Sequence, residues 1–400
     1  MSGSPTRFVR PPAFWEEADA APVVQPVREK TPMSAIQPIT MPKWGLAMEE
    51  GMLARWVVEE GASITPGDEI MDIETSKIAN VFESPVGGIL RRKVVKEGDT
   101  VPVGALLGVV ADPAVPEAEV DRYVSDFLAS FKPAEAAEAG GPSAETIEVL
   151  GKRLRHLRMG PEEGEPVLLL HGFGADMTTW MFNQGALAED RPVYALDLPG
   201  HGGSEKAVAD GAAAALAETV RAYMDAAGIG RAHLVGHSLG GAIAVEVAAS
   251  APDRVSALTL VAPAGFGPAI AGDFIAGFIA ESRARKLRPV LEMLVADPAM
   301  VTADMVEEVL KFKRLDGALD ALRAVADANF SGDSQKVAVR DRLAGLGIPV
   351  AVVWGAADRV LPAGDAEGLP EGVTVTRLDG AGHIVHMEKA SEVNEVIKGR

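Results

Sequence analysis

The 400-residue sequence contains no cysteine, which excludes disulfide bonds, thiolate metal sites and a cysteine nucleophile. Cationic residues are also scarce, because 38 Lys and Arg stand against 57 Asp and Glu, a formal net charge of −19. Nucleic acids and anionic membranes bind clustered Lys and Arg, so no nucleic acid and no membrane is expected as a partner. No apolar run is long enough to span a bilayer, and no secretory segment is visible near the N-terminus. We therefore expect a cytoplasmic protein.

What the chain does contain is enough apolar material, 48% of its residues, for two or three domains. Residues 1–35 are rich in proline with little periodicity, and we expect them to form a disordered extension. Three further segments follow from changes of pattern. They are a small β-rich domain at 36–112, a linker at 113–145 and a larger α/β domain at 146–400.

An internal repeat lies in the first domain. Residues 51–70 (GMLARWVVEEGASITPGDEI) and 88–107 (GILRRKVVKEGDTVPVGALL) align, with glycines at matching turn positions. Glycine is favoured at turns because it adopts positive φ without a steric penalty. The repeat predicts two similar small sheets related by a pseudo-twofold axis and packed as a flattened barrel.

Lys77 lies between the two copies of the repeat. Met71 and Ile73 alternate with polar neighbours, which predicts two strands joined by a tight turn at residues 75–77. A lysine at such a hairpin tip projects into solvent, where it can be modified. The neighbouring Asp72 and Glu74 are either recognition features for a ligase or partner enzyme, or solvated charges.

The stretches MPKWGLAMEEG (41–51) and IETSK (73–77) give residues 36–112 a specific resemblance to the lipoyl domains of 2-oxo-acid dehydrogenase complexes. The resemblance implies lipoate attached through an amide to Lys77 by a lipoate ligase or lipoyltransferase. Related biotinyl domains have Met on both sides of the target lysine. Ser76 and Ile78 flank it here, so biotin is the poorer fit.

The linker, residues 113–145, is rich in Pro, Ala and Glu and is expected to act as a mobile tether. Within it, residues 117–131 place one apolar helical face, made of Val120, Tyr123, Val124, Phe127, Leu128 and Phe131. The helix either docks on one of the chain's own domains or provides a docking site for a partner subunit.

The pattern changes from about residue 146 onward. Apolar strands are expected at 166–172, 192–200, 231–238, 255–265, 348–355 and 373–380, and helices at 213–228 and 239–250. Strands that are apolar throughout and alternate with helices predict a mostly parallel sheet covered on both faces. Consecutive helical patterns at about 266–343 predict a helical lid.

One pentapeptide, GHSLG at 236–240, matches the G-x-S-x-G pattern of a nucleophile elbow. It follows an apolar strand and opens a helix rich in small residues, which is the context that such an elbow needs. The sharp turn strains the backbone at Ser238, and Gly236 and Gly240 remove side chains that would clash there.

Residues 146–400 resemble the α/β-hydrolase superfamily, with further motifs in the expected order. The resemblance implies oxyanion donors at the N–H groups of Phe173, in HGFG at 171–174, and Leu239. It also implies a triad in which His383 removes the proton of Ser238 and Asp358 orients the imidazole.

Rival residues exist for two members of this triad. His386 is a weaker candidate base, and Asp379 competes with Asp358 but lies too near the histidine on the same strand end. We expect His171, His201 and His237 to order loops. No spacing of histidines and carboxylates suits a metal, so none is predicted.

The two domains suggest one reaction, in which an acyl thioester on the lipoyl arm meets a serine nucleophile and coenzyme A takes the acyl group. The whole chain resembles the dihydrolipoamide acetyltransferase components of bacterial acetoin dehydrogenase systems. That resemblance implies an acetyl group from a thiamine-diphosphate acetoin dehydrogenase component, with a flavin-dependent dihydrolipoamide dehydrogenase to reoxidise the arm. The H-x-x-x-D-G motif of conventional acyltransferase components is absent.

Two other functions fit the same residues. The first is an esterase or thioesterase that uses water and has a lipoyl carrier attached. The second is a carrier and scaffold with a vestigial triad.

Overall fold

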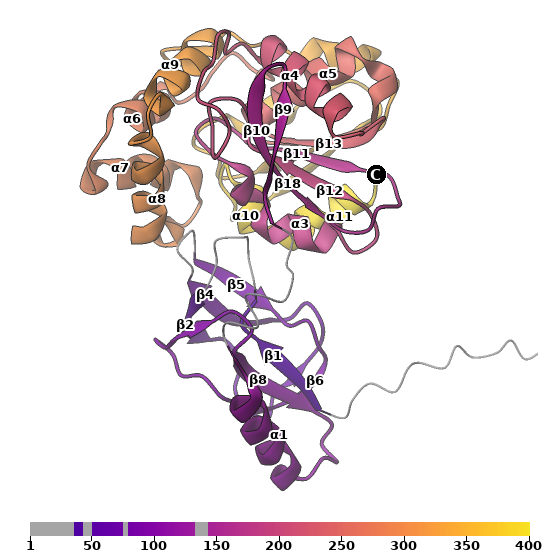
Figure 1. Cartoon of the computed structure of the whole chain (residues 1–400), viewed down its shortest axis with the longest axis vertical. Helices are drawn as coiled ribbons and strands as arrows, with labels where there is room; N and C mark the ends of the chain where they lie inside the picture. The colour runs from indigo at the N-terminus through magenta and orange to yellow at the C-terminus, as the bar shows by residue number, and fades with distance from the viewer. Residues whose placement is uncertain (1–35, 43–49, 75–78, 133–142) are drawn as a thin grey trace, which may run out of the picture. The chain divides into compact units, whose positions relative to one another are not determined.

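A computed structural model of the chain describes residues 36–42, 50–74, 79–132 and 143–400 (Figure 1). Three parts of the sequence-based prediction lie outside these residues. They are the N-terminal extension at 1–35, the hairpin tip at 75–78 with Lys77, and residues 133–142 of the tether. Among the residues described, no helix is long and apolar enough to cross a bilayer.

The N-terminal unit contains two four-stranded antiparallel sheets, with strand orders β1-β8-β6-β3 and β5-β4-β2-β7. The strands are β1 (Ile36–Thr40), β2 (Glu50–Trp56), β3 (Ser63–Ile64), β4 (Glu69–Glu74), β5 (Ala79–Glu83), β6 (Gly88–Lys93), β7 (Thr100–Pro102) and β8 (Leu106–Ala111). Each strand of the first half, β1 to β4, has a counterpart numbered four higher in the second half, and the counterparts pair in the same way. Strand β2 pairs with β4 and β7, and β6 pairs with β8 and β3. The predicted pair of similar sheets is confirmed.

The repeat's glycines adopt matching backbone conformations. Gly61 and Gly98 have φ of +91° and +86°, and Gly67 and Gly104 have φ of +92° and +81°. A side chain at these positions would be strained, which explains why the two copies share glycine at each turn. Between the sheets lies an apolar core in which Leu53, Leu90 and Ile73 are fully buried.

Helix α1 (Glu117–Ser130) packs on β8 of this unit and is not part of a free tether. Val120 is fully buried against Leu106 and Val109, and Tyr123, Val124 and Phe127 are partly buried beside it. Leu128, which the helical pattern places on the same face, is instead 54% exposed. Of the two interpretations of this helix, docking on the chain's own domain is therefore correct.

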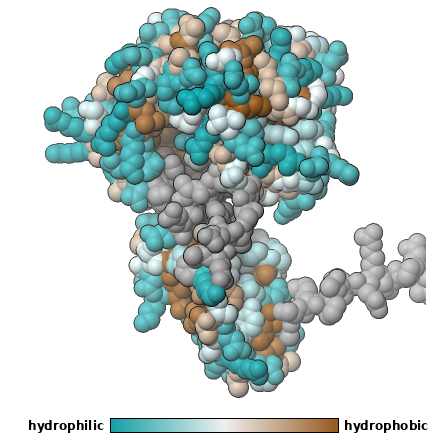
Figure 2. All heavy atoms as spheres, viewed as in Figure 1, coloured by the Kyte–Doolittle hydropathy of each residue, from teal (hydrophilic) through white to brown (hydrophobic). Residues whose placement is uncertain are grey.

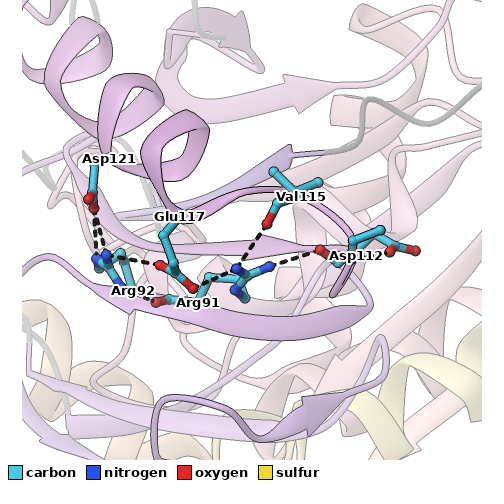
Figure 3. A network of polar contacts seen from close by, with 7 residues as sticks. Arg91, Arg92, Asp112, Val115, Glu117 and Asp121 are labelled. Carbon is cyan, nitrogen blue, oxygen red and sulfur yellow. Dashed lines mark hydrogen bonds and ion pairs between the residues drawn. The ribbon is translucent and has the colours of Figure 1, made fainter.

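Polar contacts also hold α1 in place (Figure 3). The Arg91 guanidinium donates to the carbonyl oxygens of Asp112 and Val115 at 2.9 and 3.0 Å and to Glu117 at 2.6 Å. Arg92 donates to Asp121 at 2.6 Å. These hydrogen bonds fix the first turn of α1 to strand β6, so residues 112–121 form an ordered extension of the β-rich unit.

The C-terminal unit is built on an eight-stranded sheet of order β18-β17-β14-β13-β11-β12-β10-β9. Its strands are β9 (Glu145–Val149), β10 (Lys152–Met159), β11 (Val167–Leu170), β12 (Val193–Leu196), β13 (Ala232–His237), β14 (Val255–Val261), β17 (Val350–Gly355) and β18 (Val373–Leu378). The six strands from β11 to β18 pair in parallel, as predicted. Strands β9 and β10, which the sequence analysis does not predict, form an antiparallel edge.

Helices cover both faces of this sheet. Successive residues of each buried strand point to opposite faces, so neighbouring residues pack in different cores. Leu168 and Leu234 pack with α4 (Ala213–Ala226) and α5 (Leu239–Ser250) in one core. Leu169 and Val235 pack in a second core with residues of α3 (Met181–Leu187), α10 (Val385–Glu388) and α11 (Ala390–Lys398). Figure 1 shows the two groups of helices on opposite sides of the sheet.

The predicted lid is a group of helices to one side of the sheet (Figure 1). They are α6 (Gly272–Ala280), α7 (Ala284–Leu291), α8 (Ala303–Lys313) and α9 (Ala318–Asn329). The end of the expected span, however, holds a small hairpin of β15 (Phe330–Ser331) and β16 (Ser334–Gln335). Short 3₁₀ helices complete the unit: η1 (Met177–Trp180), η2 (Pro252–Arg254), η3 (Glu292–Leu294), η4 (Pro298–Met300), η5 (Arg340–Gly345) and η6 (Ala363–Ala366). On the face drawn in Figure 2, hydrophilic side chains predominate on this unit and hydrophobic ones form separate patches.

Candidate active site

Ser238 lies at the turn between β13 and α5, with φ of 51° and ψ of −118°. A non-glycine residue with this backbone conformation is strained, and such strain is typical of functional sites. The Ser238 N–H donates to the Val261 carbonyl at 2.9 Å, and its own carbonyl accepts N–H groups from Gly241 and Ala264. These bonds on both sides of the peptide hold the serine in the strained conformation.

The two glycines of the elbow are required by close backbone contacts. A Cβ on Gly236 would lie 2.3 Å from the carbonyl oxygen of Gly240, and one on Gly240 would lie 2.3 Å from that of Leu170. A Cβ on Gly172 would lie 2.9 Å from Nδ1 of His237 and 3.0 Å from the Cβ of Ser238, a looser contact that is made with side chains. Strand β11, the HGFG segment and the elbow are therefore packed backbone to backbone.

His383 and Asp358 form a hydrogen-bonded pair. The His383 Nδ1 and the Asp358 Oδ2 are 2.8 Å apart, and both side chains are almost completely buried. Asp358 also accepts hydrogen bonds from the Trp354 indole at 3.0 Å and from the N–H groups of Val360 and Leu361 at 2.8 and 3.0 Å. Four donors thus satisfy the carboxyl group of Asp358. Because Asp358 accepts from Nδ1, the Nε2 of His383 carries the lone pair of the neutral ring.

Phe173 and Leu239, the expected oxyanion donors, lie on the two segments that flank Ser238. Leu239 is the first residue of α5, so its N–H has no partner within the helix. Within the described part of the chain, no acceptor is found for either N–H group. The Phe173 ring packs edge-on against Phe278 and Phe330 at 5.9 and 6.1 Å between ring centres. This packing joins the HGFG segment to the lid.

Ser238 and His383 line a cavity of about 430 Å³ that lies between the sheet and the lid. Most of its lining is apolar and includes Phe274, Phe278, Leu291, Met305 and Phe312. Arg155, Asp176, Glu308 and Lys311 are its charged residues. Phe173 and His237 also border the cavity, and Asp358 lies behind His383.

The rival residues have different surroundings. Asp379 is exposed, and neither it nor His386 lines the cavity. His386 is fully buried next to Trp180, and burial lowers the pKa of its imidazole to about 3. It stays neutral, and neither ring nitrogen has a partner among the described residues. Among these candidates, His383 and not His386 therefore shares the cavity lining with Ser238.

His171, His201 and His237, which are expected to order loops, contact backbone groups. His237 Nε2 lies 3.0 Å from the carbonyl oxygen of His383, so the ring donates to the loop that carries the candidate base. His171 accepts the Leu198 N–H at Nε2, and His201 Nδ1 contacts the Pro199 carbonyl at 3.0 Å. Burial lowers the pKa of His171 to about 4 and of His201 to about 3. All three rings remain neutral near pH 7.

Glu388 is a site residue that the sequence analysis misses. Its carboxylate accepts the N–H of Gly382, next to His383, at 2.6 Å and the N–H of Ala296 in the lid segment at 2.7 Å. Burial raises the pKa of this carboxyl. The residue thus fixes the histidine loop to the lid. The only feature of the sequence that could have indicated this role is the position of Glu388, five residues after His383. Its contact with Ala296 joins residues far apart in the chain and has no local pattern.

In the N-terminal unit, the register of β4 and β5 pairs Glu74 with Ala79. Residues 75–78 therefore connect two paired antiparallel strands, which fits a hairpin lysine as the attachment point of lipoate. Lys77 itself lies outside the described residues. Asp72, on β4, pairs with Arg55 of β2 at 2.8 Å, which is a contact within the sheet.

Fold and site together define an α/β-hydrolase-fold protein with a serine at the elbow and a lipoyl-type domain at its N-terminus. Residues 165–390 match the alpha/beta hydrolase fold family, and residues 37–110 match the family described as biotin-requiring enzymes. The 2-hydroxy-6-oxo-6-phenylhexa-2,4-dienoate hydrolase from Rhodococcus aligns with a TM-score of 0.59 at 22% identity, over 65% of this chain and 98% of its own.

Two relatives match both units at once. The dihydrolipoyllysine-residue acetyltransferase component of the acetoin cleaving system from Pseudomonas putida is 47% identical, over 91% of this chain and 98% of its own length. The corresponding protein from Cupriavidus necator is 45% identical, over 91% of this chain and 96% of its own length. The chain belongs to the family of dihydrolipoyllysine-residue acetyltransferase components of acetoin cleaving systems.

Proposed function

We propose that the chain transfers an acetyl group from a dihydrolipoyl-lysine thioester to coenzyme A in acetoin catabolism, with Ser238, His383 and Asp358 as its catalytic residues. One observation carries the proposal. Ser238, at a strained turn, and His383, bonded to Asp358, line the same cavity in a chain that also has a lipoyl-type domain. The names of the two full-length relatives support the acyl group and the pathway.

The residues divide the transfer into two half-reactions. In the first, His383 Nε2 removes the proton of Ser238 Oγ, and Oγ attacks the thioester carbonyl. The N–H groups of Phe173 and Leu239 stabilise the oxyanion, each by about 3–4 kcal/mol in the transition state. The carbon–sulfur bond then breaks, and His383 returns the proton to the departing sulfur. In the second, His383 deprotonates the thiol of coenzyme A, which takes the acetyl group from Ser238, and the serine regains its proton.

Lipoate, bound as an amide to Lys77, supplies the thiol that carries the acetyl group between sites. The hairpin register of β4 and β5 suits this attachment, because it leaves Lys77 in a four-residue connection. Joining this carrier to the serine site on one polypeptide raises the effective concentration of the thioester there.

The acetoin cleaving system is a multicomponent system, and we propose three partners within it. A thiamine-diphosphate acetoin dehydrogenase component generates the acetyl group. A dihydrolipoamide dehydrogenase reoxidises the dithiol, and a lipoate ligase or lipoyltransferase modifies Lys77. The proposal includes a cytoplasmic location, in which coenzyme A is at hand and a chain without cysteine needs no oxidising environment.

The proposal is tested by supplying lipoylated chain with acetyl-labelled dihydrolipoamide and coenzyme A, and measuring labelled acetyl-coenzyme A and acetate. We expect acetyl-coenzyme A as the main product, and a loss of at least about a thousandfold in Ser238→Ala, because a triad acts as a unit. Acetate as the main product identifies a thioesterase. Unchanged acetyl-coenzyme A formation in Ser238→Ala removes the serine from the reaction.

A further inference from the structure

Arg155, on strand β10, stands out among the charged residues that line the cavity. The other lysine or arginine of the lining is Lys311, whose Nζ is paired with Glu308 at 2.7 Å. The Arg155 guanidinium has no hydrogen bond or ion pair with any residue that the structure describes. Arg158, on the same strand but away from the cavity, differs because its guanidinium donates to the Pro161 carbonyl at 2.8 Å. A cation without a partner at this site is unusual in a chain with a net charge of −19.

The backbone of Arg155 is held in place, and its side chain packs over Gly203. Its N–H donates to Ser204 Oγ and its carbonyl accepts the Asp197 N–H, both at 2.9 Å. The side chain lies directly over Gly203, where an added Cβ would approach Arg155 Cδ to 2.3 Å and Nη1 to 3.0 Å. Glycine at this position therefore makes room for the arginine side chain.

The charge of Arg155 influences the buried carboxyl of Asp197, but the two side chains form no ion pair. The Asp197 Oδ1 accepts the N–H of Met177 and its Oδ2 accepts the N–H of Gly203, each at 2.7 Å. Burial raises the pKa of the Asp197 carboxyl to about 7, so near neutral pH it is only partly ionised. The five N–H donors of the Arg155 guanidinium therefore have no acceptor among the described residues and are available to a ligand.

We propose that Arg155 binds a phosphate group of coenzyme A, so that the phosphate-free pantetheine arm carries the thiol into the cavity towards Ser238. This inference rests on the proposed function, and it assigns the binding site of the acyl acceptor. The planar guanidinium matches phosphate oxygens in a bidentate arrangement, which a single ammonium group does not provide. The apolar side chains of the lid that line the cavity offer no such partner to a phosphate.

The test compares two acceptors, coenzyme A and pantetheine, which has the thiol arm but no phosphate. Acetyl transfer from acetyl-dihydrolipoamide is measured for the wild-type chain, Arg155→Ala, Arg155→Lys and the control Arg158→Ala. We expect Arg155→Ala to lower kcat/KM for coenzyme A by roughly tenfold to a hundredfold, mainly through KM, since it removes a charge-assisted contact. The value for pantetheine should stay within about twofold. Arg155→Lys should lie between wild type and Arg155→Ala, and Arg158→Ala should match wild type.

Two kinds of failure are distinct in this design. If the wild-type chain acetylates neither acceptor, the proposed function fails and the inference fails with it. If the wild-type chain acetylates coenzyme A but Arg155→Ala keeps the full preference for it over pantetheine, the inference alone is wrong. An equal loss with both acceptors also overturns it, because Arg155 would then act on the cavity and not on phosphate. Should Arg155→Ala fold poorly, Arg155→Lys and Arg155→Gln provide the same comparison.

Discussion

At the scale of single residues, the site depends on side chains that are buried but differently partnered. His383 has a carboxylate partner at Nδ1 and borders the cavity. His386, only three positions later, is enclosed by apolar and aromatic surroundings and has no partner for either nitrogen within the described residues. Of these two histidines in one short segment, only His383 is placed to act as a general base, and the sequence motif alone does not distinguish them.

The difference between these histidines predicts opposite effects of substitution. His383→Ala should lower kcat for acetyl transfer by at least about a thousandfold, since it removes the general base and acid. His386→Leu, which keeps the volume and removes two unpartnered nitrogens, should leave kcat within about threefold of wild type. Steady-state kinetics with coenzyme A as acceptor measure both. A large loss in His386→Leu, with activity retained in His383→Ala, would reverse the assignment of the base.

At the scale of elements, α1 shows how a helix that looks like part of a linker belongs to a domain. One side chain, Val120, is fully enclosed between the helix and β8, whereas Leu128 projects largely into solvent. The ion pairs of Arg91 and Arg92 with the first turn of α1 set the orientation of the helix. They contribute little to the free energy of unfolding, because exposed ion pairs are weak.

The two apolar residues of α1 therefore provide a matched pair of variants. Val120→Ala should destabilise the docked helix by about 2 kcal/mol, through lost burial and a small cavity. Leu128→Ala should change stability by no more than about 0.5 kcal/mol. Hydrogen exchange of the α1 and β8 amides in the full-length chain measures both effects. Equal protection in the two variants would mean that α1 does not dock on β8 in solution.

Much of this architecture could be predicted from local sequence patterns. The repeat revealed the two matched sheets because its turn glycines recur in register, and the elbow was visible because Gly236, Ser238 and Gly240 follow an apolar strand. Strand β10 was missed, since the sequence KRLRHLRM mixes cations with apolar residues and lacks a clear alternation. Arg155 was missed for the same reason.

The remaining site contacts join residues that are far apart in the sequence. The pairing of Glu388 with Ala296 spans 92 positions, and that of His237 with His383 spans 146. No local periodicity encodes such pairs, so they follow only once the sheet and the lid are placed together. The sequence also does not predict that Val120 is buried while Leu128 is exposed, because the helical pattern assigns both residues to one face.

At the scale of the whole molecule, the buried neutral histidines determine how the free energy of unfolding changes with pH. Burial lowers the pKa of His171 and His233 to about 4 and that of His201 and His386 to about 3, compared with 6.5 for an exposed imidazole. Between pH 6.5 and pH 4 the unfolded chain therefore binds more protons than the folded chain at these sites. Burial also raises the pKa of three carboxyls, Asp197 (to about 7), Asp365 and Glu388, which act in the opposite direction. They are fewer than the six histidines whose pKa burial lowers.

The α/β unit should consequently lose stability steeply as the pH falls from about 6.5 towards 4. Each buried histidine contributes roughly 1.4 kcal/mol per pH unit across this window, because its folded form stays neutral while its unfolded form takes up a proton. Thermal unfolding of the full-length chain at several pH values gives the slope. His386→Leu should make it shallower by about one proton, and an unchanged slope in that variant would show that His386 is not a buried neutral base.

The central claim is that the acetyl group passes through Ser238 on its way to coenzyme A. The most direct test mixes the chain with acetyl-dihydrolipoamide in the absence of coenzyme A, quenches rapidly in acid and maps acetyl groups by peptide mass spectrometry. We predict one acetyl ester on Ser238, absent in Ser238→Ala, which disappears when coenzyme A is added and appears as acetyl-coenzyme A at a rate no slower than turnover. Formation of acetyl-coenzyme A at the normal rate with Ser238 unmodified at every time point would contradict the account.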